Sequence, residues 1–218
     1  MTMRKVNVAQ GLKQSHVRIL GFLLANPSKS FTQLELAKGM GMEKSYKNVR
    51  EGLQELAQEG IVAKEEVGAS VVCSLNFKAQ KTLDYVSYLE NAKRYELFRI
   101  APKIQELSER LVEQVKLHTP FFTLLLFGSY AKGTFHEKSD VDLIIIAEKK
   151  HHENIEKATV HLQAIYSLKL NFFVMMQKDY ESMLTSKEKI NVGKESLKSH
   201  VLLYGTELYY QMVSDALW

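Results

Sequence analysis

The sequence contains a single cysteine, Cys73, among 218 residues. One cysteine excludes an internal disulfide framework and a cysteine-rich zinc site, and this scarcity is typical of a reducing compartment. No apolar run reaches the ~20 residues that a membrane-spanning helix needs, and the first ten residues lack the apolar segment of a signal peptide. We therefore expect a cytoplasmic protein with no membrane partner.

The chain also has little excess charge of either sign. It has 29 Lys and Arg residues and 25 Asp and Glu residues, which leaves a formal net charge of +4. This mildly basic balance permits an anionic partner but does not demonstrate one. The hydrophobic fraction of 45% is ordinary for a globular protein, so disordered and fibrous classes are excluded.

The first eighty residues predict a winged helix-turn-helix. An apolar stripe at helical spacing stops before Pro27, and Thr32 and Glu35 have the spacing of a capping box at the start of a second helix. A third amphipathic helix follows, and then two short strands with Gly68 in the turn between them. This order of elements is that of a winged helix-turn-helix, so we expect residues 1–80 to be a DNA-binding domain.

Four polar side chains lie at the start of the third predicted helix, away from its apolar stripe: Lys44, Lys47, Asn48 and Arg50. A recognition helix uses this position to contact phosphates and base edges in the major groove of double-stranded DNA. Glutamates in the same segment dilute the positive charge. A solvated helix face in a protein-interaction module is therefore the alternative.

Residues 81–118 predict connecting helices, with Pro102 at a helix start or a kink. Apolar residues three or four positions apart give this segment one apolar stripe, which consists of Leu97, Ile100, Ile104, Leu107, Leu111 and Val115. Such a stripe packs either on a domain or on its twin in a dimer. Together with the winged helix it leads us to expect a homodimer.

The character of the sequence changes after His118. Three short apolar runs, FFTLLLF, VDLIIIA and LNFFVMM, are too short for typical helices and are rich in aromatic or branched residues. A helix is expected between the second and third runs, at about residues 153–168, and a further helix before Gly205. Buried strands with helices between them predict a small α/β domain at residues 119–218.

The segment FGSYAKGTFHEKSDVDL, residues 127–143, carries the chemistry. Gly128 and Ser129 follow a predicted strand and precede a helical turn, where backbone N–H groups and a hydroxyl suit a phosphate. Asp140 and Asp142 are two positions apart on a strand, so their side chains project from the same face. Two carboxylates that close repel each other unless cations compensate, and a pair of Mg²⁺ ions is the economical explanation.

These residues resemble the signature of the DNA polymerase beta-like nucleotidyltransferase superfamily: Gly-Ser, a spacer of about ten residues, then Asp-hydrophobic-Asp. The short domain, with Ala131, Lys132, Gly133 and Ser139 at further motif positions, is similar to the minimal nucleotidyltransferases. The resemblance implies an α+β two-domain protein whose C-terminal nucleotidyltransferase fold has a mixed sheet. It also implies that nucleoside monophosphate moves from an NTP, with ATP as the first choice, to an acceptor hydroxyl.

The same resemblance assigns roles to individual residues. Gly128 and Ser129 would hold the triphosphate, Lys132 would add positive charge, and Asp140 and Asp142 would be the catalytic residues that bind Mg²⁺ or Mn²⁺. The acceptor is open, because minimal members modify small molecules, RNA ends or proteins.

One position departs from the family pattern. Active members usually carry a third acidic residue on a later strand, where this sequence has Asn171 or Phe173. An amide is a weaker metal ligand than a carboxylate, so one metal site would be incomplete. Two hypotheses follow: a Mg²⁺-dependent nucleotidyltransferase with a DNA-binding domain, or a DNA-binding transcriptional regulator whose second domain binds nucleotide without catalysis.

Overall fold

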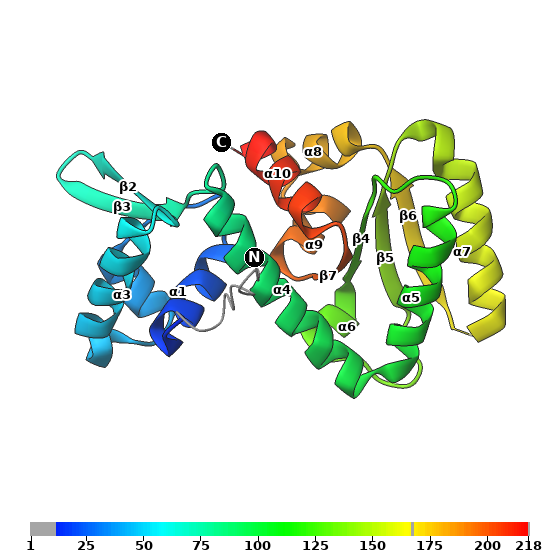
Figure 1. Ribbon diagram of the computed structural model, residues 1–218, viewed down its shortest axis with the longest axis horizontal. Coiled ribbons are helices and arrows are strands. Elements are labelled where there is room, and N and C mark those ends of the chain that lie inside the picture. Colours follow the sequence, from blue (N-terminus) through cyan, green and yellow to red (C-terminus); the bar gives the residue numbers. More distant parts are fainter. Residues whose placement is uncertain (1–11, 167, 218) are drawn as a thin grey trace, which may run out of the picture. The chain divides into compact units, whose positions relative to one another are not determined.

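The structure is a computed structural model that describes residues 12–166 and 168–217. The chain divides into two compact units, residues 1–89 and 90–218, and each is treated separately below. Figure 1 shows both units and labels most of their helices and strands. Among the described residues, no helix combines the length and the apolar character needed to cross a bilayer.

The N-terminal unit is a winged helix-turn-helix. Its elements follow one another as α1 (Gln14–Leu24), β1 (Phe31–Thr32), α2 (Gln33–Gly39), the short 3-10 helix η2 (Glu43–Ser45), α3 (Tyr46–Gln58), β2 (Val62–Val67) and β3 (Ser70–Leu75). The three strands form an antiparallel sheet in the order β1-β3-β2. The sequence did not predict the two-residue strand β1, which is too short to leave a periodic pattern.

Local signals in the sequence explain where these elements begin and end. Thr32 accepts from the backbone N–H of Glu35 while the Glu35 carboxylate accepts from the Thr32 N–H, so the predicted capping box is confirmed. Gly68 has φ +61°, which a tight turn between β2 and β3 requires. Cys73 is fully buried in β3, as expected of a core cysteine.

The C-terminal unit is an α/β domain around a mixed sheet. Helix α4 (Gln80–Ile100) enters it, and the remaining elements are α5 (Pro102–Lys116), β4 (Thr123–Phe127), α6 (Gly128–Lys132), β5 (Val141–Ile146), η3 (Lys149–His151), α7 (His152–Tyr166), β6 (Leu170–Met175), α8 (Gln177–Thr185), α9 (Val192–Lys198), β7 (Val201–Tyr204) and α10 (Thr206–Leu217). The strand order is β6-β5-β4-β7, with β5 and β6 parallel and the other pairs antiparallel. The predicted fold class is confirmed.

The apolar stripe on the connecting helices lies in the core of this unit. Helices α5 and α7 pack together on one side of the sheet (Figure 1). The stripe is buried against the sheet except at Ile100, which is 44% exposed; its buried members are Leu97, Ile104, Leu107, Leu111 and Val115. Because its own unit already covers the stripe, the stripe no longer supports the expected homodimer, which stays a prediction.

Candidate nucleotide and metal site

Asp142 is the second residue of β5, and Asp140 directly precedes the strand. Val141 and Leu143 are buried in the core, and the alternation of side chains along the strand therefore turns Asp140 and Asp142 to the opposite face. Both aspartates are partly exposed. The structure thus brings the two carboxylates to one accessible surface of the sheet.

Gly128 lies directly against Asp142. It has φ +70°, and a Cβ built on it would lie 2.0 Å from Oδ2 of Asp142. Register explains the approach, because Phe127, the last residue of β4, pairs with Asp142 across the antiparallel ladder. Glycine is therefore required here both by the backbone conformation and by the carboxylate that lies over it.

Two residues at the start of β6 bind the aspartate pair. Lys169 Nζ lies 2.7 Å from Oδ2 of Asp140, and Asn171 Nδ2 donates to Oδ1 of Asp142 at 3.0 Å. In the parallel ladder Asp142 pairs with Asn171, so Asn171 occupies the neighbouring-strand position expected for a third carboxylate. The next residue on that face, Phe173, packs 6.4 Å from the Phe127 ring, centroid to centroid.

No other acidic residue completes the site. Asp179 accepts from the backbone N–H of Met176 and caps α8, and Glu181 accepts from Gln177 on the same helix. Within residues 12–166 and 168–217, no three His, Cys, Asp or Glu side chains converge to hold a metal ion. Position 171 is thus the place where this site departs from a three-carboxylate site.

The donor set still fits one hard divalent cation. Two carboxylates on one face supply anionic oxygens, and a half turn of the Asn171 amide presents its Oδ1 in place of Nδ2. Lys169 would have to leave Asp140, and its side chain is 79% exposed, so water can solvate the released ammonium. A divalent ion bound there would neutralise and polarise the oxygens of a phosphate group.

The predicted phosphate-binding residues follow β4 directly. Ser129 and Lys132 are in the short helix α6, which ends at Gly133 with φ +69°. Lys132 is exposed at the last turn, and its charge, after that of Lys198, contributes to the lowered pKa of Glu195. The structure therefore brings Gly128 to the aspartates and leaves Lys132 with an acidic neighbour on α9.

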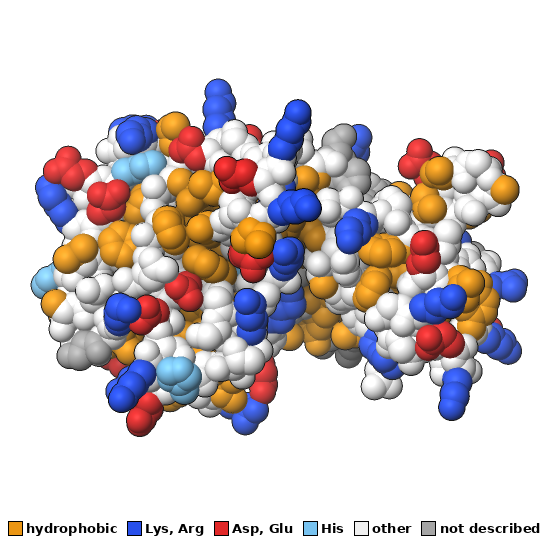
Figure 2. All heavy atoms as spheres, turned by 180° about the vertical axis from the view of Figure 1, so that it is seen from behind, with side chains coloured by type: hydrophobic (Ala, Val, Ile, Leu, Met, Phe, Trp, Pro, Cys, Tyr) orange, Lys and Arg blue, Asp and Glu red, His pale blue; other side chains and the backbone are white. Residues whose placement is uncertain are grey.

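An open cleft of about 750 Å³ adjoins β6 in the same unit. Most of its accessible lining is apolar, and it is formed by side chains that include Phe173, Met175, Met183 and Asn191. Figure 2 shows hydrophobic side chains gathered on one face of the C-terminal unit. The cleft borders the strand that carries Asn171.

Comparison with known families agrees with this geometry. Residues 104–201, just under half of the chain, match the family model described as a nucleotidyltransferase domain. This segment is a nucleotidyltransferase domain. The match includes the Gly-Ser pair, both aspartates and Asn171, so the resemblance predicted from the motif is confirmed.

Solved structures show only distant likeness. One described as a toxin-antitoxin with AMP-PNP is 17% identical and covers 50% of this chain and 85% of its own, with a TM-score of 0.34. TrmBL2, described as an archaeal chromatin protein with a novel mode of DNA binding, is 16% identical over 85% of this chain and 74% of its own, with a TM-score of 0.28. No curated protein matches the sequence significantly. Neither structure is similar enough to say more about residues 104–201 than the family match does.

The predicted DNA-contacting residues lie in the N-terminal unit, at and just before the start of α3. All four side chains are exposed: Lys44, Lys47, Asn48 and Arg50. The core of the unit uses the other face of α3, where Val49, Leu53 and Leu56 are buried. The structure thus presents the four residues on one solvent-facing end of the helix.

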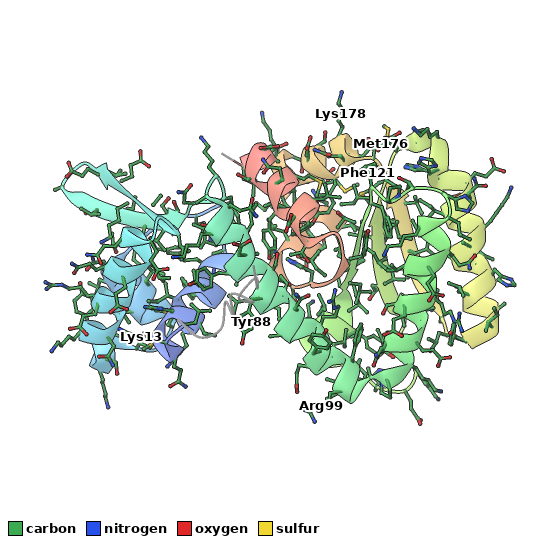
Figure 3. All side chains as sticks on the ribbon, viewed as in Figure 1. Lys13, Tyr88, Arg99, Phe121, Met176 and Lys178 are labelled. Carbon is green, nitrogen blue, oxygen red and sulfur yellow. The ribbon has the colours of Figure 1, made fainter. Side chains whose placement is uncertain are left out.

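Acidic side chains share that surface. Lys47 lies 3.8 Å from Glu51, a loose and exposed ion pair, whereas Glu55 is bound by Lys13 and by His16. Lys13 is labelled in Figure 3. On the N-terminal unit in Figure 2, Lys and Arg side chains are interspersed with acidic and hydrophobic ones. The four predicted DNA-contacting residues therefore lie on a surface of mixed charge.

Sequence reasoning missed Lys169. Its only signal was its position two residues before Asn171, which puts both side chains on one face of a strand. That signal pointed to Asp140 only if β5 and β6 are parallel and in this register, and the sequence does not reveal strand register.

Proposed function

We propose that the nucleotidyltransferase domain transfers nucleoside monophosphate from an NTP, with ATP tested first, to an acceptor hydroxyl in a reaction that depends on Mg²⁺ or Mn²⁺. The observation that carries this proposal is the close approach of the Asp142 carboxylate to the Gly128 backbone, beside Asp140. The family match to residues 104–201 supports it. The acceptor is a small molecule, an RNA end or a protein.

The residues divide the work of an in-line displacement. Gly128 and Ser129 bind the triphosphate through backbone N–H groups and a hydroxyl, and Lys132 adds positive charge. Asp140 and Asp142 would hold the divalent ion, which would neutralise charge on the phosphate oxygens. The acceptor oxygen forms a bond to the α-phosphorus as the bond to the bridging oxygen breaks and pyrophosphate leaves. Positioning and charge neutralisation supply the catalysis, so no covalent enzyme intermediate is needed.

A direct test measures pyrophosphate release with labelled ATP, GTP, CTP and UTP, Mg²⁺ and candidate acceptors. Release by the unmodified protein should disappear in the double variant Asp140→Ala and Asp142→Ala. Asp215→Ala is the matched control, because Asp215 is an exposed carboxylate on α10 that accepts from Gln211. Release that persists in the double variant contradicts the assignment of the aspartates.

The alternative is a DNA-binding regulator whose second domain binds nucleotide without transferring it. The presence of an amide at Asn171 and the ion pair between Lys169 and Asp140 favour this alternative. Nucleotide binding without pyrophosphate release on any acceptor would support it. In both versions we propose that the N-terminal unit binds double-stranded DNA through Lys44, Lys47, Asn48 and Arg50.

The DNA proposal has its own test. Replacing Lys44, Lys47 and Arg50 with Gln should weaken duplex binding and reduce the salt dependence by roughly one unit of slope per lost phosphate contact. Lys81→Gln is the control, because Lys81 pairs with Glu59 away from the start of α3. Equal affinity and equal salt slope in the triple variant and the control would rule out this surface as the DNA contact.

A further inference from the structure

The site contains a cation of its own. Lys169 Nζ lies 2.7 Å from Oδ2 of Asp140, on the oxygen-rich face where the proposed function requires a divalent ion. Two neighbouring carboxylates repel each other unless a positive charge compensates, and the Lys169 ammonium supplies that charge when no metal ion is bound.

Strand pairing builds the contact. The backbone N–H of Val141 donates to the carbonyl of Lys169 at 2.9 Å, and the ladder continues from there with Val141 opposite Leu170. This register puts Lys169 beside Asp140 and Asn171 beside Asp142 on one face. The two contacts therefore follow from a single parallel pairing.

We propose that Lys169 is an internal counter-cation that competes with divalent metal for Asp140 and thereby sets the metal requirement of the site. This inference rests on the proposed function, because it concerns the metal ion that the reaction uses. Lys169 is a positioning residue here: it acts through Asp140 and does not touch the reacting atoms.

Exposure makes the exchange reversible. The Lys169 side chain is 79% exposed and that of Asp140 is 35% exposed, so water solvates the ammonium when a metal ion displaces it. Asn171 also lowers the metal affinity of the site, because its amide donates to Asp142 and carries no negative charge to attract a second cation. The pair Lys169 and Asn171 thus keeps metal affinity low until the ion concentration, or a nucleotide that brings its own ion, shifts the balance.

The test measures Mn²⁺ binding to the full chain by titration calorimetry and by the electron paramagnetic resonance of free Mn²⁺. Lys169→Gln should tighten binding about two- to fivefold, the range of an exposed ion pair. Lys169→Arg should bind as the unmodified chain does. Asn171→Asp should tighten binding roughly tenfold, because it adds an anionic ligand.

Two controls make the result specific. Lys157→Gln removes an equal charge from an exposed ion pair with Glu153 on α7 and should leave Mn²⁺ affinity unchanged. In an Asp140→Asn background Lys169→Gln should no longer change the Mn²⁺ affinity, since Lys169 then has no Asp140 carboxylate for which to compete with the metal ion. Equal Mn²⁺ affinity in the unmodified chain and Lys169→Gln, or no Mn²⁺ binding by either, overturns the proposal.

Mn²⁺ affinity tests the role of Lys169, and pyrophosphate release tests the proposed transfer, so the two can fail independently. Tighter Mn²⁺ binding in Lys169→Gln without pyrophosphate release by any variant supports the role of Lys169 and contradicts transfer. Pyrophosphate release together with equal Mn²⁺ affinity in the unmodified chain and in Lys169→Gln supports transfer and overturns the role of Lys169.

Discussion

Replacing Gly128 with Ala adds a single methyl group, which should displace the Asp142 carboxylate from its position in the candidate site. The new Cβ would lie 2.0 Å from Oδ2 and 2.9 Å from Cγ of Asp142. To restore an ordinary contact of 3.4 Å, the carboxylate has to move by about 1.4 Å. That movement should also disturb the hydrogen bond that Oδ1 of the same carboxylate accepts from the Asn171 amide, which is 3.0 Å long in the structure.

The magnitude has two parts. An L-residue in the left-handed region costs about 1–2 kcal/mol, and loss of the hydrogen bond between Asn171 and Asp142 costs a further ~0.5–1.5 kcal/mol. Misplacing a catalytic group by about 1 Å lowers the rate roughly 100-fold. We therefore expect Gly128→Ala to lose modest stability and nearly all pyrophosphate release.

Gly68→Ala is a matched control outside the motif, because Gly68 has φ +61° and a Cβ there would meet nothing within 4 Å. It should cost the same backbone strain, about 1–2 kcal/mol, but keep the activity. Urea denaturation, with amide hydrogen exchange of residues 90–218 as the readout, reports the stability of the C-terminal unit separately. If the two variants release pyrophosphate at equal rates, the close approach of Gly128 to Asp142 does not matter for the reaction.

Three further predictions concern the two units. Leu111→Ala should destabilise the C-terminal unit by about 2–5 kcal/mol in urea denaturation, because the side chain is fully buried in the core. Thr32→Ala should lower the stability of the N-terminal unit by about 0.5–2 kcal/mol, since the cap of α2 is lost. Burial lowers the pKa of His200, although Glu90 opposes the shift and Lys93 adds to it. Its neutral form is favoured on folding, so stability should fall as the pH drops below the ordinary histidine pKa of about 6.5.

Each of these predictions has a matched comparison. Leu117→Ala removes an equal side chain that is 73% exposed and should change little. Thr32→Ser keeps the hydroxyl and should retain the cap. His200→Gln removes the titrating group, so the acid-side loss of stability, measured by denaturation at pH 5 and pH 7.5, should be smaller than in the unmodified chain. An unchanged pH dependence would mean that another group causes it.

Much of the fold was predictable from local pattern. The capping box at Thr32 and Glu35, the turn at Gly68 and the helix start at Pro102 follow from the chemistry of a few neighbouring residues. The apolar runs predicted the strands for the same reason. The strands that escaped prediction, β1 (Phe31–Thr32) and β7 (Val201–Tyr204), are too short for a periodic signal.

The sequence by itself determined the Gly-Ser motif, the aspartate pair, the amide at position 171 and the winged-helix order of elements, because these depend on residue types and short spacings. Only the tertiary structure decided that the apolar stripe on α4 and α5, apart from Ile100, is buried within its own unit. It alone also brought Lys169 to Asp140 and Gly128 to Asp142. These contacts depend on strand order and register, which long-range packing sets and no local pattern specifies.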